Sequence, residues 1–315
     1  MIKKIVLSLF LCISIPSIAQ ETPFKITEIQ INSLLKGDLY TPVPEIKKPT
    51  LIILIAGSGP TNRNGNQIGM QNNSLKYLAE DLTKEQRAVF TYDKRVIAQI
   101  IAGTVNEKDM RFEDMITDAV TVFDHFKKTG NYSKIVFAGH SEGSQIGMIA
   151  AQQTKADGFI SIAGPGRPID EILIDQITKQ APGVKEELIS SLEKIKKGET
   201  VTVESPLLSS MFRESVQPYM TSWIQYKPQQ EIQKLKIPVL LLNGTKDLQV
   251  SESEAELLKK AKPDASLVII PNMNHVLKTI TGDDAENRTS YNKPETRNTP
   301  ELAQAINLFL KKHKL

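Results

Sequence analysis

The sequence predicts an α/β fold, in which a mostly parallel central sheet is flanked by helices and carries a helical insertion that forms a lid. Two observations support this prediction. Short apolar segments alternate with helical patterns from residue 51 to residue 164, as is typical of parallel strands joined by crossover helices. The alternation then stops over residues 165–231 and resumes at residue 237, which predicts the insertion.

The predicted elements follow in chain order. Period-2 alternation at Ile26, Ile29 and Ile31 predicts a half-exposed antiparallel strand over residues 25–32, followed by a second strand over 33–40. Apolar runs predict strands at 51–55, 88–92, 135–138, 158–164, 237–242 and 266–270, and the continuous run at 51–55 is typical of a strand covered on both faces. Helical spacing predicts helices at 74–85, 112–127, 145–153, 171–180, 185–197, 251–260 and 300–312. The polar residues 281–298 predict a surface loop.

Residues 1–20 have the pattern of a secretory signal peptide. Lys3 and Lys4 precede an apolar run over residues 5–15, and Ser17-Ile18-Ala19 supplies a small-x-small cleavage site. The alternative is a buried N-terminal helix. The apolar run is short for a bilayer-spanning helix, which argues against stable membrane insertion. We therefore expect a domain over residues 21–315 that is secreted or periplasmic.

Composition excludes several classes of site. The chain has 315 residues, 40% hydrophobic and 24% charged, and one cysteine, Cys12, which lies inside the predicted signal peptide. A mature chain without cysteine has no disulfide, cysteine nucleophile or thiolate metal site. The formal charge of +3 falls to +1 without Lys3 and Lys4. This balance indicates neither nucleic acid nor an anionic membrane as a partner, and no cofactor or metal is expected.

Residues 139–143 have the G-x-S-x-G pattern of a nucleophile elbow. The pattern directly follows an apolar strand and precedes a helical segment, which is the structural context that the motif requires. In such an elbow the serine occupies a strained turn, so its neighbours must be nearly free of side chains, and Gly139 and Gly143 meet that demand. We therefore expect Ser141 to be a nucleophile; a chance match to the motif is the alternative.

A serine nucleophile needs a base and an acid that orients the base. Asp247 and His275 each follow the end of an apolar strand, and the carboxyl ends of parallel strands meet at one edge of a sheet. The order Ser141, Asp247, His275 is also the order of nucleophile, acid and histidine in α/β-hydrolases. The alternatives are less well placed: they are Glu252, Glu254 and Glu256 within a predicted helix for the acid, and His125, His140 and His313 for the base.

The tetrahedral intermediate needs N–H donors that face its oxyanion. One donor is expected from the residue after the nucleophile, Glu142, and the other from the turn after the third strand, at Ser58 or alternatively at Gly59. Both are backbone groups, so the side chains at these positions are expected to be free to vary.

The predicted insertion contains the only tryptophan, Trp223, and a concentration of aromatic and methionine residues. Two interpretations remain open. These residues form the insertion's own small core, or they line a pocket over the elbow as part of a lid.

The sequence resembles the α/β-hydrolase superfamily, and in particular bacterial esterases of the serine-aminopeptidase-like, bile-acid-acyltransferase-related group. The resemblance covers nearly all of the mature chain. It departs from the family at Val96, where members tend to have Gly, and at Asn62 and Asn64, where acidic residues are common. The segments that carry the resemblance are 57–60, 62–65, 92–95, 139–143, 163–165 and 244–247.

The resemblance implies hydrolysis of a small-molecule carboxylic ester through an acyl-enzyme, with Ser141, His275 and Asp247 as the catalytic residues. A peptidase or amidase and an acyltransferase share the same elbow and remain alternatives, as does a non-catalytic binding protein of this fold. An exopeptidase would need a charged pocket for a free amine. The insertion offers acidic residues without a clear cluster: Asp170, Glu171, Asp175 and Glu214. The oligomeric state is left open.

Overall fold

The computed structural model describes residues 23–315, so the predicted signal peptide over residues 1–20 lies outside the described residues. The strands of the described chain form one eight-stranded sheet in the order β1-β2-β4-β3-β5-β6-β7-β8. Their bounds are β1 Phe24–Gln30, β2 Lys36–Pro42, β3 Thr50–Ile55, β4 Ala88–Tyr92, β5 Lys134–His140, β6 Gly158–Ile162, β7 Val239–Gly244 and β8 Ser266–Ile270.

Strand pairing confirms the predicted mostly parallel sheet. β1 pairs antiparallel with β2 and β2 antiparallel with β4, whereas all pairs from β4 to β8 are parallel. The second strand begins at Lys36, three residues later than predicted, because residues 32–35 form a turn in which the side chain of Asn32 accepts hydrogen bonds from the backbone N–H groups of Leu34 and Leu35.

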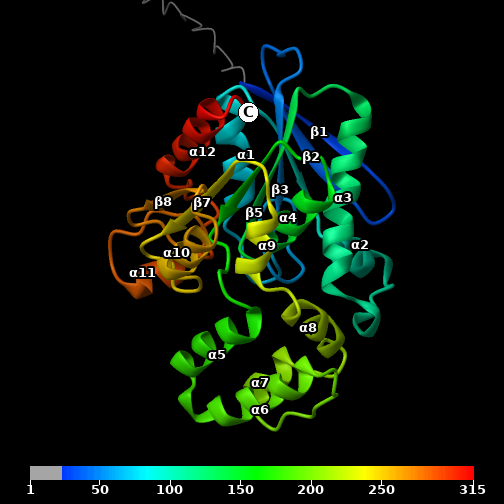
Figure 1. Cartoon of the computed structure of the whole chain (residues 1–315), viewed down its shortest axis with the longest axis vertical. Coiled ribbons are helices and arrows are strands. Elements are labelled where there is room, and N and C mark those ends of the chain that lie inside the picture. Colours follow the sequence, from blue (N-terminus) through cyan, green and yellow to red (C-terminus); the bar gives the residue numbers. More distant parts are fainter. Residues whose placement is uncertain (1–22) are drawn as a thin grey trace, which may run out of the picture.

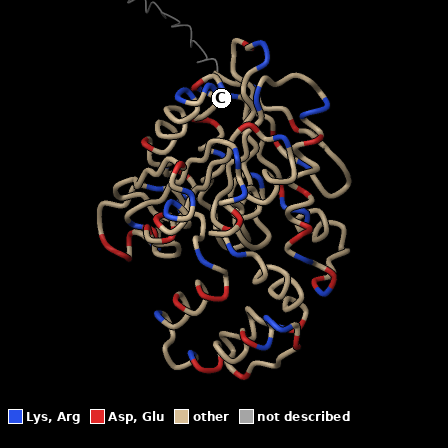
Figure 2. Tube along the Cα trace, viewed as in Figure 1, with Lys and Arg blue, Asp and Glu red and all other residues tan. Residues whose placement is uncertain are grey.

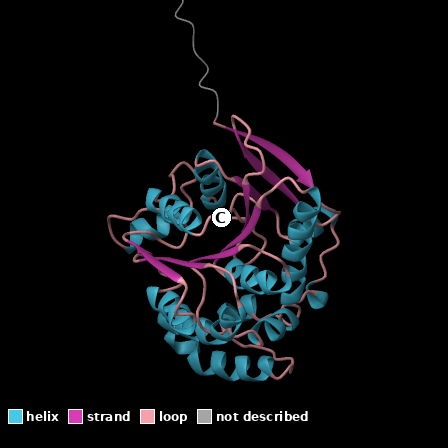
Figure 3. Ribbon diagram, turned by 45° about the horizontal axis from the view of Figure 1, so that its top comes forward, coloured by secondary structure: helices cyan, strands magenta, loops and turns pink. Residues whose placement is uncertain are grey.

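Helices cover both faces of this sheet, as Figure 3 shows. One face packs against α1 and α12, and the other packs against α3, α4, α9 and α10 in a second apolar cluster. The bounds of the helices outside the insertion are α1 Ser74–Lys84, α2 Arg95–Ala102, η1 Glu107–Asp109, α3 Phe112–Thr129, α4 Glu142–Gln153, α10 Glu252–Ala261, α11 Asp284–Ser290 and α12 Pro300–Lys312.

Helices α5 to α8, which lie between β6 and β7 in the chain, form a group at the end of the molecule opposite the C-terminus, whereas α9 packs beside α4 and α10 in the main body (Figure 1). Phe212, Leu188, Leu192 and Ile195 are buried among these helices, in an apolar core that is continuous with the core on the adjoining face of the sheet. The bounds are α5 Ile169–Gln180, η2 Pro182–Val184, α6 Lys185–Lys196, α7 Pro206–Met211, α8 Gln217–Ile224 and α9 Pro228–Lys234.

Several helical features differ from the predictions. α4 begins at Glu142, not at residue 145, because Ser141 is its N-cap residue and the Ser141 carbonyl accepts from the N–H of Ser144 at 2.9 Å. α2 was not predicted; it buries none of its residues. The predicted loop over 281–298 contains α11, whose N-cap Asp283 accepts from the N–H groups of the next turn.

Charged residues of both signs are scattered along the trace, in the main body and in the insertion (Figure 2). Over residues 23–315, no helix is long and apolar enough to cross a membrane.

Candidate active site

Ser141 lies alone between β5 and α4, in a backbone conformation that side chains rarely adopt. Its φ is 55° and its ψ is −123°. Its N–H donates to the carbonyl of Ile162 at the end of β6, at 2.9 Å, which helps to hold this conformation. A strained residue of this kind costs about 1–3 kcal/mol and persists where the surrounding structure holds it. The turn places Ser141 at the carboxyl edge of the sheet.

Gly139 and Gly143 are required by close approach and not by a positive φ. A Cβ on Gly139 would lie 2.0 Å from the carbonyl oxygen of Gly143, and a Cβ on Gly143 would lie 2.3 Å from the carbonyl oxygen of Ile55. These distances are far shorter than any van der Waals contact. Glycine at both positions therefore lets α4 begin directly against the ends of β3 and β5.

Asp247 and His275 come together at the same edge. Asp247 follows β7, His275 follows β8, and Asp247 Oδ2 lies 2.8 Å from His275 Nδ1. The two side chains are only 1% and 6% exposed, respectively. Asp247 Oδ1 accepts from the N–H groups of Gln249 and Val250 at 2.8 and 2.9 Å. The carboxylate is therefore fixed on both oxygens, and its free acceptor direction faces the imidazole.

The other candidates for these roles are engaged or distant. Glu254 binds the guanidinium and backbone N–H of Arg167 and the N–H of Gly166. His125 lies within α3, and the ring of His313 packs on Phe309 at the end of α12.

His140 has a role that the sequence did not reveal. Its Nε2 donates to the backbone carbonyl of His275 at 2.7 Å, and the two rings lie 4.8 Å apart. Burial, together with the neighbouring His275, lowers the pKa of His140 to about 3. His140 is therefore neutral at physiological pH and holds the backbone of the loop that carries His275. No spacing signal identifies this contact, since it joins residues 135 positions apart.

The predicted oxyanion donors lie beside Ser141. Gly57 touches the elbow, because a Cβ added there would lie 3.2 Å from Ser141 Cβ. Ser58 lines the same cavity as Ser141 and His275. Gly59 follows with φ 77°, and its carbonyl accepts from the N–H of Thr61.

The Glu142 side chain is not free to vary, contrary to the prediction. It is 2% exposed, lies 2.9 Å from Lys94 Nζ and accepts from the hydroxyl of Tyr219 at 2.7 Å. A buried carboxylate needs such partners because desolvation penalises an unpaired charge. Lys94 and Tyr219 were not predicted as site residues.

Two cavities meet at Ser58. A small polar cavity of about 100 Å³ is lined by Ser141 and His275 among others. A larger cavity of about 310 Å³ opens under α8 and is lined mainly by apolar side chains: Val96, Met110, Met115, Met211, Val216, Met220 and Trp223.

The aromatic residues of the insertion lie in two kinds of surroundings. Trp223 stacks on Phe112 with ring centroids 5.3 Å apart, and its Nε1 donates to Gln145 Oε1 at 2.8 Å. It also lines the larger cavity, whereas Phe212 is only 1% exposed, in the insertion's core.

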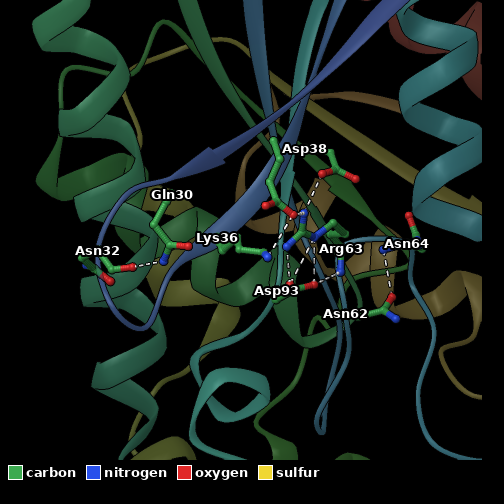
Figure 4. Close-up of polar contacts among 9 residues, drawn as sticks. Gln30, Asn32, Lys36, Asp38, Asn62, Arg63, Asn64 and Asp93 are labelled. Carbon is green, nitrogen blue, oxygen red and sulfur yellow. Dashed lines mark hydrogen bonds and ion pairs between the residues drawn. The ribbon is translucent and has the colours of Figure 1, made fainter. Parts of the chain in front are cut away.

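Arg63 links the loop after β3 to the edge of the sheet (Figure 4). Its Nε and Nη2 bind Asp93 at 3.1 and 2.7 Å, and its Nη1 binds Asp38 and Glu28. Asn62 Oδ1 accepts from backbone N–H groups of its own loop, including that of Asn64. Three carboxylates thus bind one guanidinium. Arg63, Asp93 and Asn62, which belong to the segments that carry the family resemblance, therefore stabilise this part of the fold.

Within the described chain, no group of three or more His, Cys, Asp or Glu side chains could hold a metal ion.

Known proteins resemble this chain in sequence. The family model described as "Serine aminopeptidase, S33" matches residues 68–279. Esterase EstD from Thermotoga maritima is 27% identical over 286 residues, which are 89% of this chain and 66% of that protein. The chain therefore spans just under two thirds of that relative's length.

Two solved structures share the fold. Est1E from Butyrivibrio proteoclasticus has a TM-score of 0.60 at 18% identity, covering 91% of this chain and 98% of that one. The Pyrococcus horikoshii acylaminoacyl peptidase has a TM-score of 0.55 at 13% identity, covering 93% of this chain and 42% of that one. Together with the sheet order and the match over residues 68–279, these comparisons show that the chain has the α/β-hydrolase fold and belongs to the serine aminopeptidase S33 family.

Proposed function

We propose that this protein is a serine hydrolase that cleaves carboxylic esters, with Ser141 as nucleophile, His275 as base and Asp247 as the residue that orients the base. The observation that carries the proposal is the buried contact of 2.8 Å between Asp247 and His275, beside a serine in a strained turn. This arrangement can activate a hydroxyl that is otherwise a weak nucleophile.

In the proposed reaction, Ser141 Oγ attacks the acyl carbon while its proton passes to His275 Nε2. The ester C–O bond then breaks, and His275 returns the proton to the departing alkoxide. Water attacks the acyl-enzyme in the same way, and the carboxylic acid leaves. The N–H groups of Ser58 and Glu142 stabilise the oxyanion in both steps, and Asp247 keeps the proton of the neutral imidazole on Nδ1.

The apolar cavity supports an ester with a hydrocarbon acyl or alcohol group. It is lined by methionine side chains, which adapt to ligands of different shape, and by Trp223. Because α8 supplies several of these residues, we assign the insertion over residues 165–231 the role of a lid over the elbow. The curated relative named as an esterase supports the same bond type.

The charges near the elbow favour an ester over a peptide with a free amine. Each carboxylate that lines the larger cavity has a basic partner: Glu142 binds Lys94 and Glu107 binds Arg213. An anchor for an ammonium group would be a carboxylate without such a partner.

The test is hydrolysis of p-nitrophenyl esters of graded acyl length, with amino-acid p-nitroanilides measured in parallel. Ester turnover that falls by roughly 10⁴-fold or more in Ser141→Ala is expected. Ser253→Ala, on the surface of α10, is the matched control and should keep full activity. Unchanged turnover in Ser141→Ala overturns the proposal, and faster cleavage of the anilides would assign a peptidase instead.

We also propose that the chain is exported and cleaved after the segment over residues 1–20. Sequencing the N-terminus of the mature protein from the cell envelope or the medium tests this. An intact Met1 in those fractions, or retention of all the protein in the cytoplasm, contradicts it.

A further inference from the structure

Three polar side chains form a group beside the elbow, of which Lys94 and Glu142 are buried and Tyr219 is half-buried. They come from different parts of the chain, since Lys94 follows β4, Glu142 begins α4 and Tyr219 lies in α8 of the insertion. Lys94 and Glu142 are 6% and 2% exposed. Lys94 Nζ lies 2.9 Å from Glu142 Oε1, and the Tyr219 hydroxyl donates to the same oxygen at 2.7 Å. Burial raises the pKa of Tyr219 far above its usual range, and the negative Glu142 raises it further.

Lys94 also binds the backbone next to the first proposed oxyanion donor. Its Nζ donates to the carbonyl oxygen of Gly57 at 3.1 Å. The Gly57–Ser58 peptide is trans, so the N–H of Ser58 points away from that carbonyl. The ammonium thus fixes the rotation of the peptide plane and, with it, the direction of the Ser58 N–H. The positive charge of Lys94 beside the Gly57 carbonyl oxygen also polarises the peptide group and strengthens the Ser58 N–H as a donor.

The second proposed donor belongs to the other partner of Lys94. Glu142 contributes its backbone N–H to the oxyanion and its carboxylate to the ion pair. The ammonium of Lys94 therefore connects the Gly57–Ser58 peptide to Glu142. The N–H groups of Ser58 and Glu142 are the two donors that must converge on one oxygen atom. Catalysis is sensitive to this convergence, because a donor stabilises the oxyanion only when it already points at the correct position.

We infer that Lys94, Glu142 and Tyr219 are positioning residues that set the geometry of the oxyanion hole, and that Tyr219 makes this geometry depend on how α8 is seated. The inference rests on the proposed function, because it takes Ser58 and Glu142 as the oxyanion donors. It assigns the insertion a part in catalysis beyond covering the substrate.

The first test compares Lys94→Met with the wild type. Methionine keeps the length of the side chain and removes the charge and the donors. The expected result is a kcat for p-nitrophenyl butyrate that is roughly 10–100-fold lower, with a KM within about threefold. The affinity for an alkyl trifluoromethyl ketone, whose adduct places an oxyanion in the hole, should fall by the same factor as kcat/KM. The methyl ketone of the same chain forms no such adduct and should bind equally well to both proteins.

Lys262→Met is the matched control. Lys262 is also buried, at 7% exposure, and its Nζ also binds one backbone carbonyl, that of Leu235 at 3.1 Å, and one carboxylate, that of Asp264 at 2.9 Å. It lies after α10 and outside both cavities. Its variant should match the wild type in kcat and in trifluoromethyl ketone affinity.

The double variant Lys94→Met/Glu142→Gln separates positioning from folding. The single variant buries an unpaired carboxylate, and the double variant removes that charge, so the thermal midpoint should rise again while kcat stays low. Tyr219→Phe keeps the ring and the shape of the cavity. It should lower kcat and ketone affinity together, by roughly 3–10-fold, and it serves as the second test if Lys94→Met does not fold.

The inference is overturned if kcat stays within threefold in Lys94→Met and Tyr219→Phe, if kcat falls without a loss of ketone affinity, or if the double variant regains full activity. These outcomes differ from a failure of the proposed function. If the proposed function is wrong, the wild type shows no ester hydrolysis that depends on Ser141, and the inference about the oxyanion hole is then wrong as well.

Discussion

Replacing Asp247 by asparagine removes one charge and leaves no orientation of the side chain that satisfies its neighbours while the imidazole proton of His275 stays on Nδ1. One carboxylate oxygen accepts the His275 Nδ1 proton at 2.8 Å, and the other accepts the N–H groups of Gln249 and Val250. An asparagine whose oxygen faces the two N–H groups points its NH₂ at His275. The imidazole must then carry its proton on Nε2 and cannot accept the proton of Ser141. The opposite orientation places the NH₂ against two N–H donors.

The structure gives the size of the expected effect. With the wrong tautomer of His275, kcat should fall by roughly 10³–10⁴-fold, which corresponds to about 4–5 kcal/mol in the activation barrier. The three hydrogen bonds of this side chain lose their charge, which should lower the free energy of unfolding by about 1–3 kcal/mol. Steady-state hydrolysis of p-nitrophenyl butyrate and urea unfolding measure the two effects separately.

Asp157→Asn is the control for this prediction. Asp157 also accepts from a backbone N–H, that of Ile135 at 2.9 Å, and from one basic side chain, that of Lys134, but it lies at the opposite edge of the sheet, before β6. Its variant should keep the wild-type kcat. An Asp247→Asn protein that folds and turns over within tenfold of the wild type refutes the role given to Asp247.

Three further predictions concern stability. The pKa of His140 is about 3, below its value of 6.5 outside the fold, so protonation favours the unfolded chain as pH falls from 6.5 towards 3. At about pH 5 protonation of this group should lower the free energy of unfolding by at most about 2 kcal/mol. In urea unfolding, His140→Asn should lack this part of the pH dependence. If the stability of both proteins depends on pH in the same way, the prediction is contradicted. Gly143→Ala places a methyl group 2.3 Å from a carbonyl oxygen of β3, whereas Gly183→Ala meets nothing within 4 Å. The first should lower the thermal midpoint by about 4 °C or more and the second should not, so equal midpoints count against the packing described here. Arg63→Met leaves its carboxylate partners without a cation and should cost about 2–4 kcal/mol in urea unfolding, while a cost below 1 kcal/mol would show the ion cluster to be unimportant.

The sequence predicts the sheet well because buried parallel strands are continuous apolar runs bounded by loops. The same reasoning missed α2, none of whose apolar residues is fully buried: Ile101 is 82% exposed. It also missed α11, because its seven residues, which are all polar except Ala285, have no periodic apolar pattern. Local hydrogen bonds, and not burial, define such short elements.

The loops that contain the candidate catalytic residues could be predicted because the carboxyl ends of parallel strands share one edge. The contacts among side chains could not. Lys94 meets Glu142 48 residues later, and Tyr219 meets Glu142 across 77 residues. Contacts between elements this far apart leave no spacing pattern in the sequence, and the prediction that the Glu142 side chain is free to vary was wrong for this reason.

The nucleophile assignment is tested most directly by labelling the purified protein with a fluorophosphonate and mapping the adduct by peptide mass. A single adduct per chain on the peptide that contains Ser141, formed in step with the loss of ester hydrolysis and absent in Ser141→Ala, is the predicted result. An adduct on another residue, or full hydrolysis after complete labelling of Ser141, would contradict the account.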